Sequence, residues 1–325
     1  MKTELKNTKS SRFTQFILAF CCILFAAIGS LVGEIAFPLS ISTMAALFLF
    51  DSTKQRRLSI IVSILLVLLN VFTFTLRIGS SFFAAATVIL GYLIYIAFNN
   101  KQSKSDYAFL MTLIAGFIIA FGYVVLPMNL AGEYTGEVVV EFYTNLVTIL
   151  RGEFVKLLFE AYSTAGLDVT TDMIAEIFNS QLNMIISYVL IMSFFIVGVS
   201  FKMFGFLVKK LAIDDTEINS FRFSTTNLFA YFYIILTLAS VFVSSQNGIL
   251  GISVLNLYNF FLFVYAYVGF NVALSLFIKK FKPVISVILL LVALVVMSSL
   301  GVQILAVLGV MFTIRKNTEN RLMTK

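Results

Sequence analysis

The stretch from Leu58 to Leu76 reads LSIIVSILLVLLNVFTFTL and contains no charged residue. The hydrocarbon core of a bilayer takes about 20 residues of α-helix, so this stretch is long enough to cross it once. Its apolar residues do not alternate with polar ones, whereas a strand of a transmembrane β-barrel alternates over roughly ten residues. The stretch therefore predicts a membrane-spanning α-helix.

The rest of the chain repeats this pattern. Of the 325 residues, 60% are hydrophobic and 12% are charged, and the mean hydropathy is +1.00; a soluble domain carries about 25% charged residues. Short charged clusters separate further apolar runs over 13–33, 35–50, 79–98, 108–128, 184–201, 223–244, 252–278 and 284–314. We predict an all-α polytopic integral membrane helical bundle with about 9–10 membrane segments. Residues 1–325 are expected to form a single integral membrane domain.

The distribution of Lys and Arg predicts the orientation, because these residues are held on the cytoplasmic side of short loops. With the N-terminus inside, nearly all of them fall in inside loops, and only Arg77, Arg151 and Lys156 fall outside. The inverted orientation would reverse this distribution. The sequence therefore predicts a cytoplasmic N-terminus.

The last apolar run, over 284–314, is too long for one simple span. At 1.5 Å per residue a straight helix would measure roughly 46 Å, against a hydrocarbon core of about 30 Å. We expect the run to fold back at Ser298-Ser299-Leu300-Gly301, which places the basic C-terminus in the cytoplasm with the N-terminus. The alternative is one tilted helix whose last turns leave the membrane.

Residues 129–183 form the one long hydrophilic insertion, and the orientation places it outside the cytoplasm. Apolar and polar residues recur there at helical spacing. We predict an acidic amphipathic helix over about 137–162, a break at 163–168 and a second helix from Thr171, which could continue into the span that begins at Met184. The acidic residues are Glu133, Glu137, Glu141, Glu153, Glu160, Asp168, Asp172 and Glu176.

The sequence lacks several residues and motifs on which common catalytic, metal-binding and proton-transfer sites depend. It has no His, so nucleophilic catalysis that relies on a His base is excluded. Cys21 and Cys22 are adjacent, which does not suit a zinc site, and no Gly-rich phosphate loop of the ATPase type is present. Apart from Glu34, every Asp and Glu falls outside the predicted spans, which argues against a proton relay. We expect no enzyme activity, no cofactor and no metal site.

Four polar residues near or within the spans are candidate ligand-binding residues. Asn256 and Asn259 share a helix face, and Asn271 follows on the same apolar run. Their amides could line a polar cavity for a neutral ligand, or they could bond neighbouring helices, which is the more common role. Glu34 lies between two predicted spans, as an anionic ligand or as a solvated turn residue.

In its C-terminal half the sequence resembles the YybS-like family of uncharacterised bacterial polytopic membrane proteins. The stretches that carry this likeness are Phe221-Arg222-Phe223, Gly269-Phe270-Asn271-Val272-Ala273 and Met311-Phe312-Thr313-Ile314-Arg315-Lys316. The layout of the N-terminal half is similar to that of the substrate-binding components of energy-coupling-factor transporters. The resemblance implies a multi-pass protein of the bacterial cytoplasmic (inner) membrane.

Two functions fit these observations. The first is a small-solute-binding or transport subunit that relies on a membrane or ATPase partner subunit for energy. The alternative is a structural or regulatory membrane scaffold that acts through the 129–183 insertion or the 202–222 cytoplasmic loop. The net charge of +7 reflects topology and contact with anionic lipid rather than nucleic-acid binding.

Overall fold

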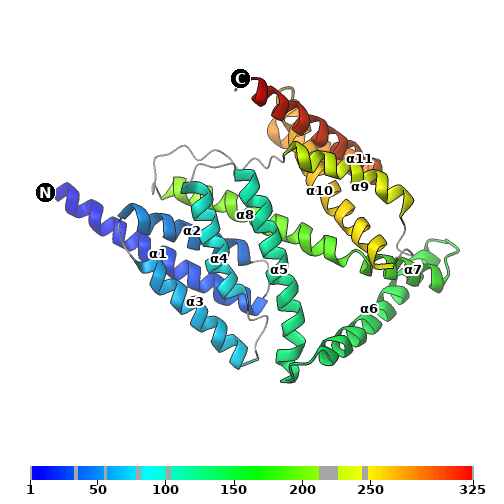
Figure 1. Ribbon diagram of the computed structural model, residues 1–325, viewed down its shortest axis with the longest axis horizontal. Coiled ribbons are helices and arrows are strands. Elements are labelled where there is room, and N and C mark those ends of the chain that lie inside the picture. The colour runs from blue at the N-terminus through cyan, green and yellow to red at the C-terminus, as the bar shows by residue number, and fades with distance from the viewer. Residues whose placement is uncertain are drawn as a thin grey trace. The chain divides into compact units, whose positions relative to one another are not determined.

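The computed structural model describes residues 2–32, 36–54, 57–77, 82–99, 104–211, 226–243 and 248–323. Within this part of the chain the regular elements are helices, labelled α1 to α11 in Figure 1. Six of them contain stretches that are long and apolar enough to cross a membrane. The all-α, multi-pass membrane class that the sequence predicts is therefore confirmed.

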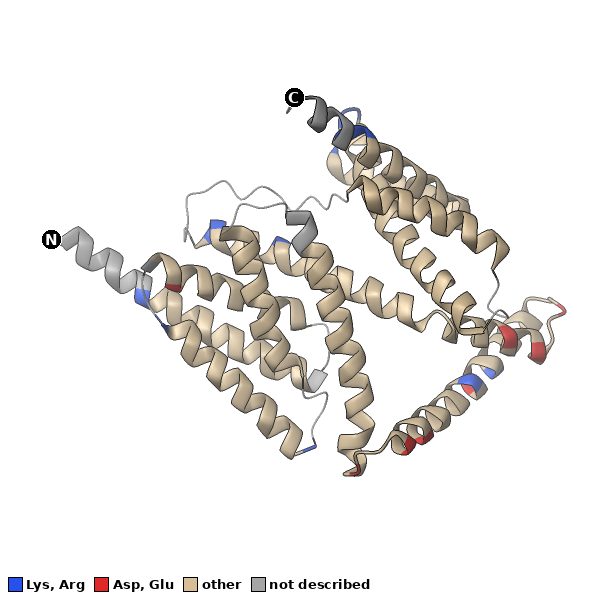
Figure 2. Ribbon diagram, in the orientation of Figure 1, with Lys and Arg blue, Asp and Glu red and all other residues tan. Residues whose placement is uncertain are grey.

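Each apolar run of the sequence lies largely in a helix, and α1, α8 and α11 extend beyond their runs by about nine to eleven residues at one end. The helices are α1 (Lys2–Val32), α2 (Phe37–Lys54), α3 (Leu58–Thr75), α4 (Phe83–Asn99), α5 (Lys104–Ala131), α6 (Gly136–Thr164), α7 (Thr171–Leu182), α8 (Ile185–Lys210), α9 (Asn227–Phe242), α10 (Gly248–Ile278) and α11 (Pro283–Met323). In the described part, the charged residues gather near helix ends and along α6 and α7, as Figure 2 shows. The spans between them are apolar because no water is present in hydrocarbon to solvate a charge.

The contacts divide the chain into two compact units. The first comprises 1–150 and 192–222, and the second comprises 151–191 and 223–325. Helices α6 and α8 each contribute to both units. The two units are described separately below.

Helix α2 is the buried centre of the first unit, where it packs against α1, α3 and α4. Phe37, Ile41 and Met44 have no exposed surface. Gly91 of α4 lets α2 approach closely, since a Cβ added there would lie 2.9 Å from the Cβ of Met44. The hydroxyl groups of Ser40 and Thr87 meet at 2.8 Å between the two helices. Helix α2 is therefore shielded from lipid by its neighbours.

The second unit contains α9, α10 and α11, and the closest helix pair is α10 with α11. The two backbones cross at Gly269 and Gly309. A Cβ on Gly269 would lie 1.8 Å from the carbonyl oxygen of Leu305, and one on Gly309 would lie 2.1 Å from that of Tyr265. Only glycine leaves room for this crossing, as at other small-residue contacts between membrane helices.

The expected fold-back at Ser298-Ser299-Leu300-Gly301 is wrong. Helix α11 continues without a break through these residues, and the alternative of one continuous helix is confirmed. A glycine costs only about 1 kcal/mol inside a helix, which the contacts along α10 can offset. The cytoplasmic placement of the C-terminus depends on the fold-back, so the continuous helix removes the basis for it.

The helices of the 129–183 insertion agree with the sequence. Helix α6 covers the predicted amphipathic segment, and α7 begins at Thr171 as expected. Gly166 ends α6 in the left-handed conformation, with φ of 72°, while the N–H of Leu167 donates to the carbonyl oxygen of Tyr162 at 3.0 Å. This is the Schellman arrangement that satisfies the last carbonyl groups of a helix. The second helix does not run on into the span, because turn residues 183–184 separate α7 from α8.

A proline inside α5 explains how α6 is attached to it. Pro127 has no N–H, so it cannot bond the carbonyl oxygen of Tyr123 one turn earlier. The hydroxyl group of Tyr143, in α6, donates to that oxygen at 2.6 Å. Burial raises the pKa of the Tyr143 phenol above its ordinary value. The carbonyl group released by the proline thus accepts a hydrogen bond that links α6 to α5.

The close crossing of α10 and α11 predicts that a methyl group added at Gly269 lowers the stability of the protein. Gly269→Ala places a Cβ against the backbone of α11, so the two helices must move apart. We expect this change to lower stability in detergent by about 3 kcal/mol, the upper end of the usual cost of overpacking. Gly122→Ala in α5 is the matched control, since its Cβ would meet nothing within 4 Å. Equal melting temperatures for the two variants would contradict the crossing.

The link between Pro127 and Tyr143 predicts a coupled pair of substitutions. Tyr143→Phe leaves the Tyr123 carbonyl without its donor, and we expect a loss of about 0.5–1.5 kcal/mol in unfolding free energy. Pro127→Ala restores the N–H that this carbonyl lacks, so Tyr143→Phe is expected to cost little in that background. A double-mutant cycle measured by unfolding in mixed micelles tests this. Additive effects would show that the two residues are not linked.

Candidate functional site

The second unit contains a cavity of about 340 Å³, open on one side, that brings together polar groups of three helices and an apolar side chain of a fourth. Ligand sites in proteins commonly measure about 300–1,000 Å³. None of the described residues that line it is charged. The lining residues are Ser180, Gln181, Met184, Ser187, Tyr188, Ile191, Asn259, Leu262, Phe263 and Val302, from α7, the turn that follows it, α8, α10 and α11.

Asn256 positions the wall of this cavity. It is almost fully buried in α10, and its amide oxygen accepts the N–H of Ser187, in the first turn of α8, at 2.8 Å. Its amide nitrogen donates to the carbonyl oxygens of Asn183 at 2.6 Å and Ile252 at 2.8 Å. The residue before α8 is Met184, which has no side-chain oxygen to cap the helix. Asn256 therefore caps α8 from the neighbouring helix. Its amide has the role of bonding neighbouring elements rather than of lining the cavity.

Asn259, one turn further along α10, faces the cavity itself. Its side chain is half-buried, and its amide nitrogen donates to the sulfur of Met184 at 3.0 Å. A thioether is a weak acceptor, so a ligand oxygen could replace it at small cost. Across the cavity, the hydroxyl of Tyr188 donates to the side-chain oxygen of Gln181. The walls thus offer neutral amide and hydroxyl groups, which suit hydrogen bonding to an uncharged ligand.

Of the other two candidate residues, Asn271 lies in the described part of the chain and does not line this cavity. Asn271 is exposed, and its amide nitrogen donates to the carbonyl oxygen of Tyr267 in its own helix at 2.8 Å. Glu34 lies outside the described residues. In the 202–222 segment, residues 202–210 are the last turns of α8, and residues 212–222 lie outside the described part. Of the three candidate asparagines, Asn259 lines the cavity, and Asn256, one turn earlier on α10, bonds the start of α8 beside it.

The sequence did not reveal the role of the α7–α8 junction. Gln181, Tyr188, Ser180 and Ser187 are ordinary residues for a helix end, and nothing in their spacing indicates a partner on α10. The sequence does contain one indication of a polar site, since several hydrogen-bonding side chains occur where the span of α8 begins. Pairing them with Asn259 required the tertiary structure.

A buried carboxylate was also missed. Asp51 is in the last turns of α2 rather than in a loop, and only 4% of its surface is exposed. Its oxygens accept the side-chain N–H of Gln15 in α1 and the backbone N–H of Ser59 in α3, the latter at 2.6 Å. Arg57, the N-cap residue of α3, makes no side-chain cap, and the N-terminus of a helix attracts an anion. The expectation that all acidic residues except Glu34 fall in loops, tails or the insertion is therefore wrong for Asp51. Its contacts make it a structural cap.

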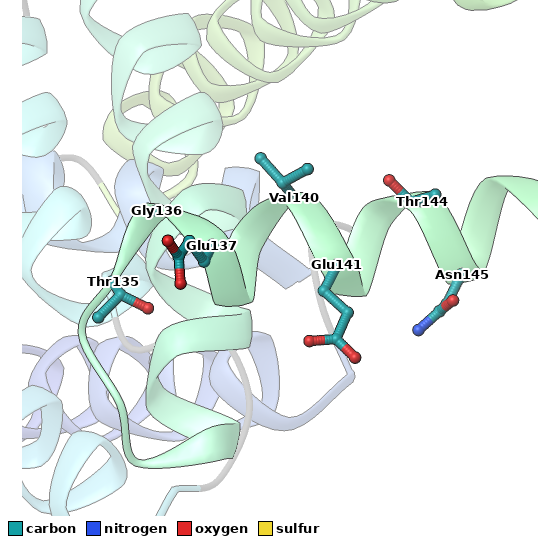
Figure 3. Close-up of a pocket in the computed structure, with 7 residues that line it drawn as sticks. All are labelled: Thr135, Gly136, Glu137, Val140, Glu141, Thr144 and Asn145. Atoms are coloured by element: carbon teal, nitrogen blue, oxygen red, sulfur yellow. The ribbon is translucent and has the colours of Figure 1, made fainter.

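A second, larger hollow of about 850 Å³ lies beside the start of α6. Figure 3 shows that its labelled residues all come from the turn before α6 and the first turns of that helix. Glu137 and Glu141 provide its carboxylates, together with Thr144 and Asn145. Because these residues come from one side of a single helix and the turn before it, the hollow is an open surface with Val140 at its apolar edge rather than an enclosed site.

Within the described part of the chain, no group of three or more His, Cys, Asp or Glu residues could hold a metal ion. Comparison with protein-family models, curated proteins and solved structures gives no match for this chain. The cavity beside Asn259 is therefore the feature on which a functional proposal can be based.

The role of Asn256 as a cap predicts a loss of stability on its removal. Asn256→Ala leaves the Ser187 N–H and the Asn183 carbonyl without their side-chain partner, and we expect a cost of about 1–3 kcal/mol. Asn271→Ala is the control, because that side chain is exposed and bonds only its own helix. Thermal melting in detergent measures both. Similar melting temperatures for the two variants would contradict the capping role.

Proposed function

We propose that this chain is a small-solute-binding or transport subunit of the bacterial cytoplasmic membrane. The solute would bind in the cavity of the second unit, beside Asn259. The observation that carries this proposal is a pocket of about 340 Å³ lined by neutral hydrogen-bonding groups. In a chain whose spans are otherwise apolar, polar side chains facing a common space are expected at binding sites and pathways.

The lining favours an uncharged, polar solute. Moving an ion out of water into a cavity without a counter-charge is costly, and no described lining residue is charged. The amides of Asn259 and Gln181 and the hydroxyl of Tyr188 can each donate and accept, while Leu262 and Phe263 provide apolar contact. Compounds that combine a flat or aliphatic body with amide or hydroxyl groups fit this surface.

Energy for transport would come from a partner or a gradient. The sequence contains no Gly-rich phosphate loop of the ATPase type. We propose that a membrane or ATPase partner subunit supplies the energy, that the chain is not itself an enzyme, and that it belongs with the YybS-like proteins that its C-terminal half resembles. The resemblance supports the bacterial location.

A scaffold remains the second candidate function. It is favoured by α6, which buries none of its residues and so could recruit a partner protein from the 129–183 insertion. Deleting the insertion distinguishes the two functions in cells. Loss of partner recruitment with solute uptake intact would favour the scaffold, whereas loss of uptake alone would favour the transport subunit.

Substitution of Asn259 tests the proposed binding site. The purified protein would be melted with a panel of nucleosides, polyols and small amides, and we expect at least one class to raise the melting temperature. Asn259→Leu should remove this shift because the amide is lost and the cavity becomes smaller. Asn271→Leu on the same helix should retain it. The same shift in both variants, or no shift with any compound, would contradict binding at this cavity.

A further inference from the structure

The first half of α6 carries an apolar face that is half-buried to exposed in the described part of the chain. The helix has no buried residue. Ile149 is 64% exposed and Leu150 is 49% exposed, although both are large aliphatic side chains. At 100° per residue the apolar side chains of this half fall on one broad side of the helix. They are Val138, Val139, Val140, Phe142, Leu146, Val147, Ile149 and Leu150.

The opposite side of this segment is polar. Glu137, Glu141, Asn145 and Thr148 follow one another at spacings of three and four residues, so they form one stripe. Figure 3 shows Glu141 and Asn145 on the same side of the helix. The segment therefore has the composition of a helix that lies between an apolar medium and water.

The apolar face is interrupted beyond Gly152. Glu153 and Glu160 follow Leu146 at seven-residue spacing, while Leu157, which is 62% exposed, follows Leu150 at the same spacing. Carboxylates thus mix with apolar side chains on this side of the second half of α6. The continuous apolar face covers about 138–150.

The hydrogen bond from Tyr143 fixes this segment at the membrane boundary. Tyr123, which accepts the bond, lies within the candidate span over 108–131, eight residues before its end. At 1.5 Å per residue this is about 12 Å below the end of α5. Helices that lie in the bilayer interface place their apolar face about 5–10 Å into the boundary of head groups and acyl chains. The start of α6 is thus held at a similar depth.

The surface of α5 near this bond is itself of the kind that faces lipid. Phe117 is 72% exposed, Phe121 46% and Val124 43%. Because α5 is a membrane span, these exposed side chains contact acyl chains. The apolar side of α6 begins beside this lipid-facing surface and is anchored to it by Tyr143.

We propose that residues 138–150 of α6 form an interfacial membrane helix. Their apolar face lies among the lipids at the boundary where α5 ends, and Glu137, Glu141, Asn145 and Thr148 face the water. The lipid surface, rather than a partner protein, is the occupant of this face because the segment is tied to a lipid-exposed span at the depth of the interface. This inference is independent of the proposed solute site.

The absence of tryptophan from the chain makes a direct experiment possible. A single tryptophan introduced by Ile149→Trp reports on the apolar side of α6, and Thr148→Trp, at the adjacent position, reports on the polar side. Phe117→Trp in α5 serves as the lipid-facing reference. Each full-length variant is reconstituted into phosphatidylcholine vesicles with and without brominated acyl chains. Fluorescence emission is then compared.

We expect brominated lipid to quench Ile149→Trp and the Phe117→Trp reference several-fold more than Thr148→Trp. The emission of Ile149→Trp should also lie at shorter wavelength than that of Thr148→Trp. Equal quenching at positions 148 and 149 would overturn the proposal. So would short-wavelength emission from Ile149→Trp without quenching while the reference is quenched, because protein would then cover this face.

Discussion

The first turn of a helix has backbone N–H groups without partners in the helix, and the hydrocarbon of a membrane provides no water to satisfy them. Two membrane helices of this chain begin with residues that cannot cap them, Arg57 before α3 and Met184 before α8. In each case a buried side chain from another helix provides the acceptor: Asp51 for Ser59 and Asn256 for Ser187. These caps from neighbouring helices set where α3 and α8 start, and the packing of both units depends on them.

The same constraint explains the Pro127 region. A proline releases one carbonyl group in α5, and that group accepts the hydroxyl of Tyr143. Polar groups between membrane helices are usually satisfied by each other because no solvent competes for them. Here one carbonyl group without a helical partner accepts a hydrogen bond from the insertion, and this bond joins the insertion to the membrane span before it. One hydrogen bond thus links α6 to the proline turn of α5.

The number and strength of the hydrogen bonds that a buried amide makes indicate its role in this structure. Asn256 has three hydrogen bonds to protein atoms, which marks it as part of the framework. Asn259 donates to a sulfur atom and faces a cavity. A strong donor paired with a weak acceptor is ready to exchange its partner for a better one. For this reason the proposed site is placed at Asn259 and not at the more deeply buried Asn256.

The sequence by itself determined the membrane class, the approximate location of the apolar helices, and the two helices of the 129–183 insertion, because hydrophobic length and amphipathic period are local properties of the chain. It also pointed to Asn256 and Asn259 as a pair on one face. It could not distinguish their roles, place Asp51 inside a helix end, or show that α11 continues through Gly301. These outcomes were decided by tertiary structure, since a cap from another helix, a glycine crossing and a cavity wall each depend on residues distant in sequence.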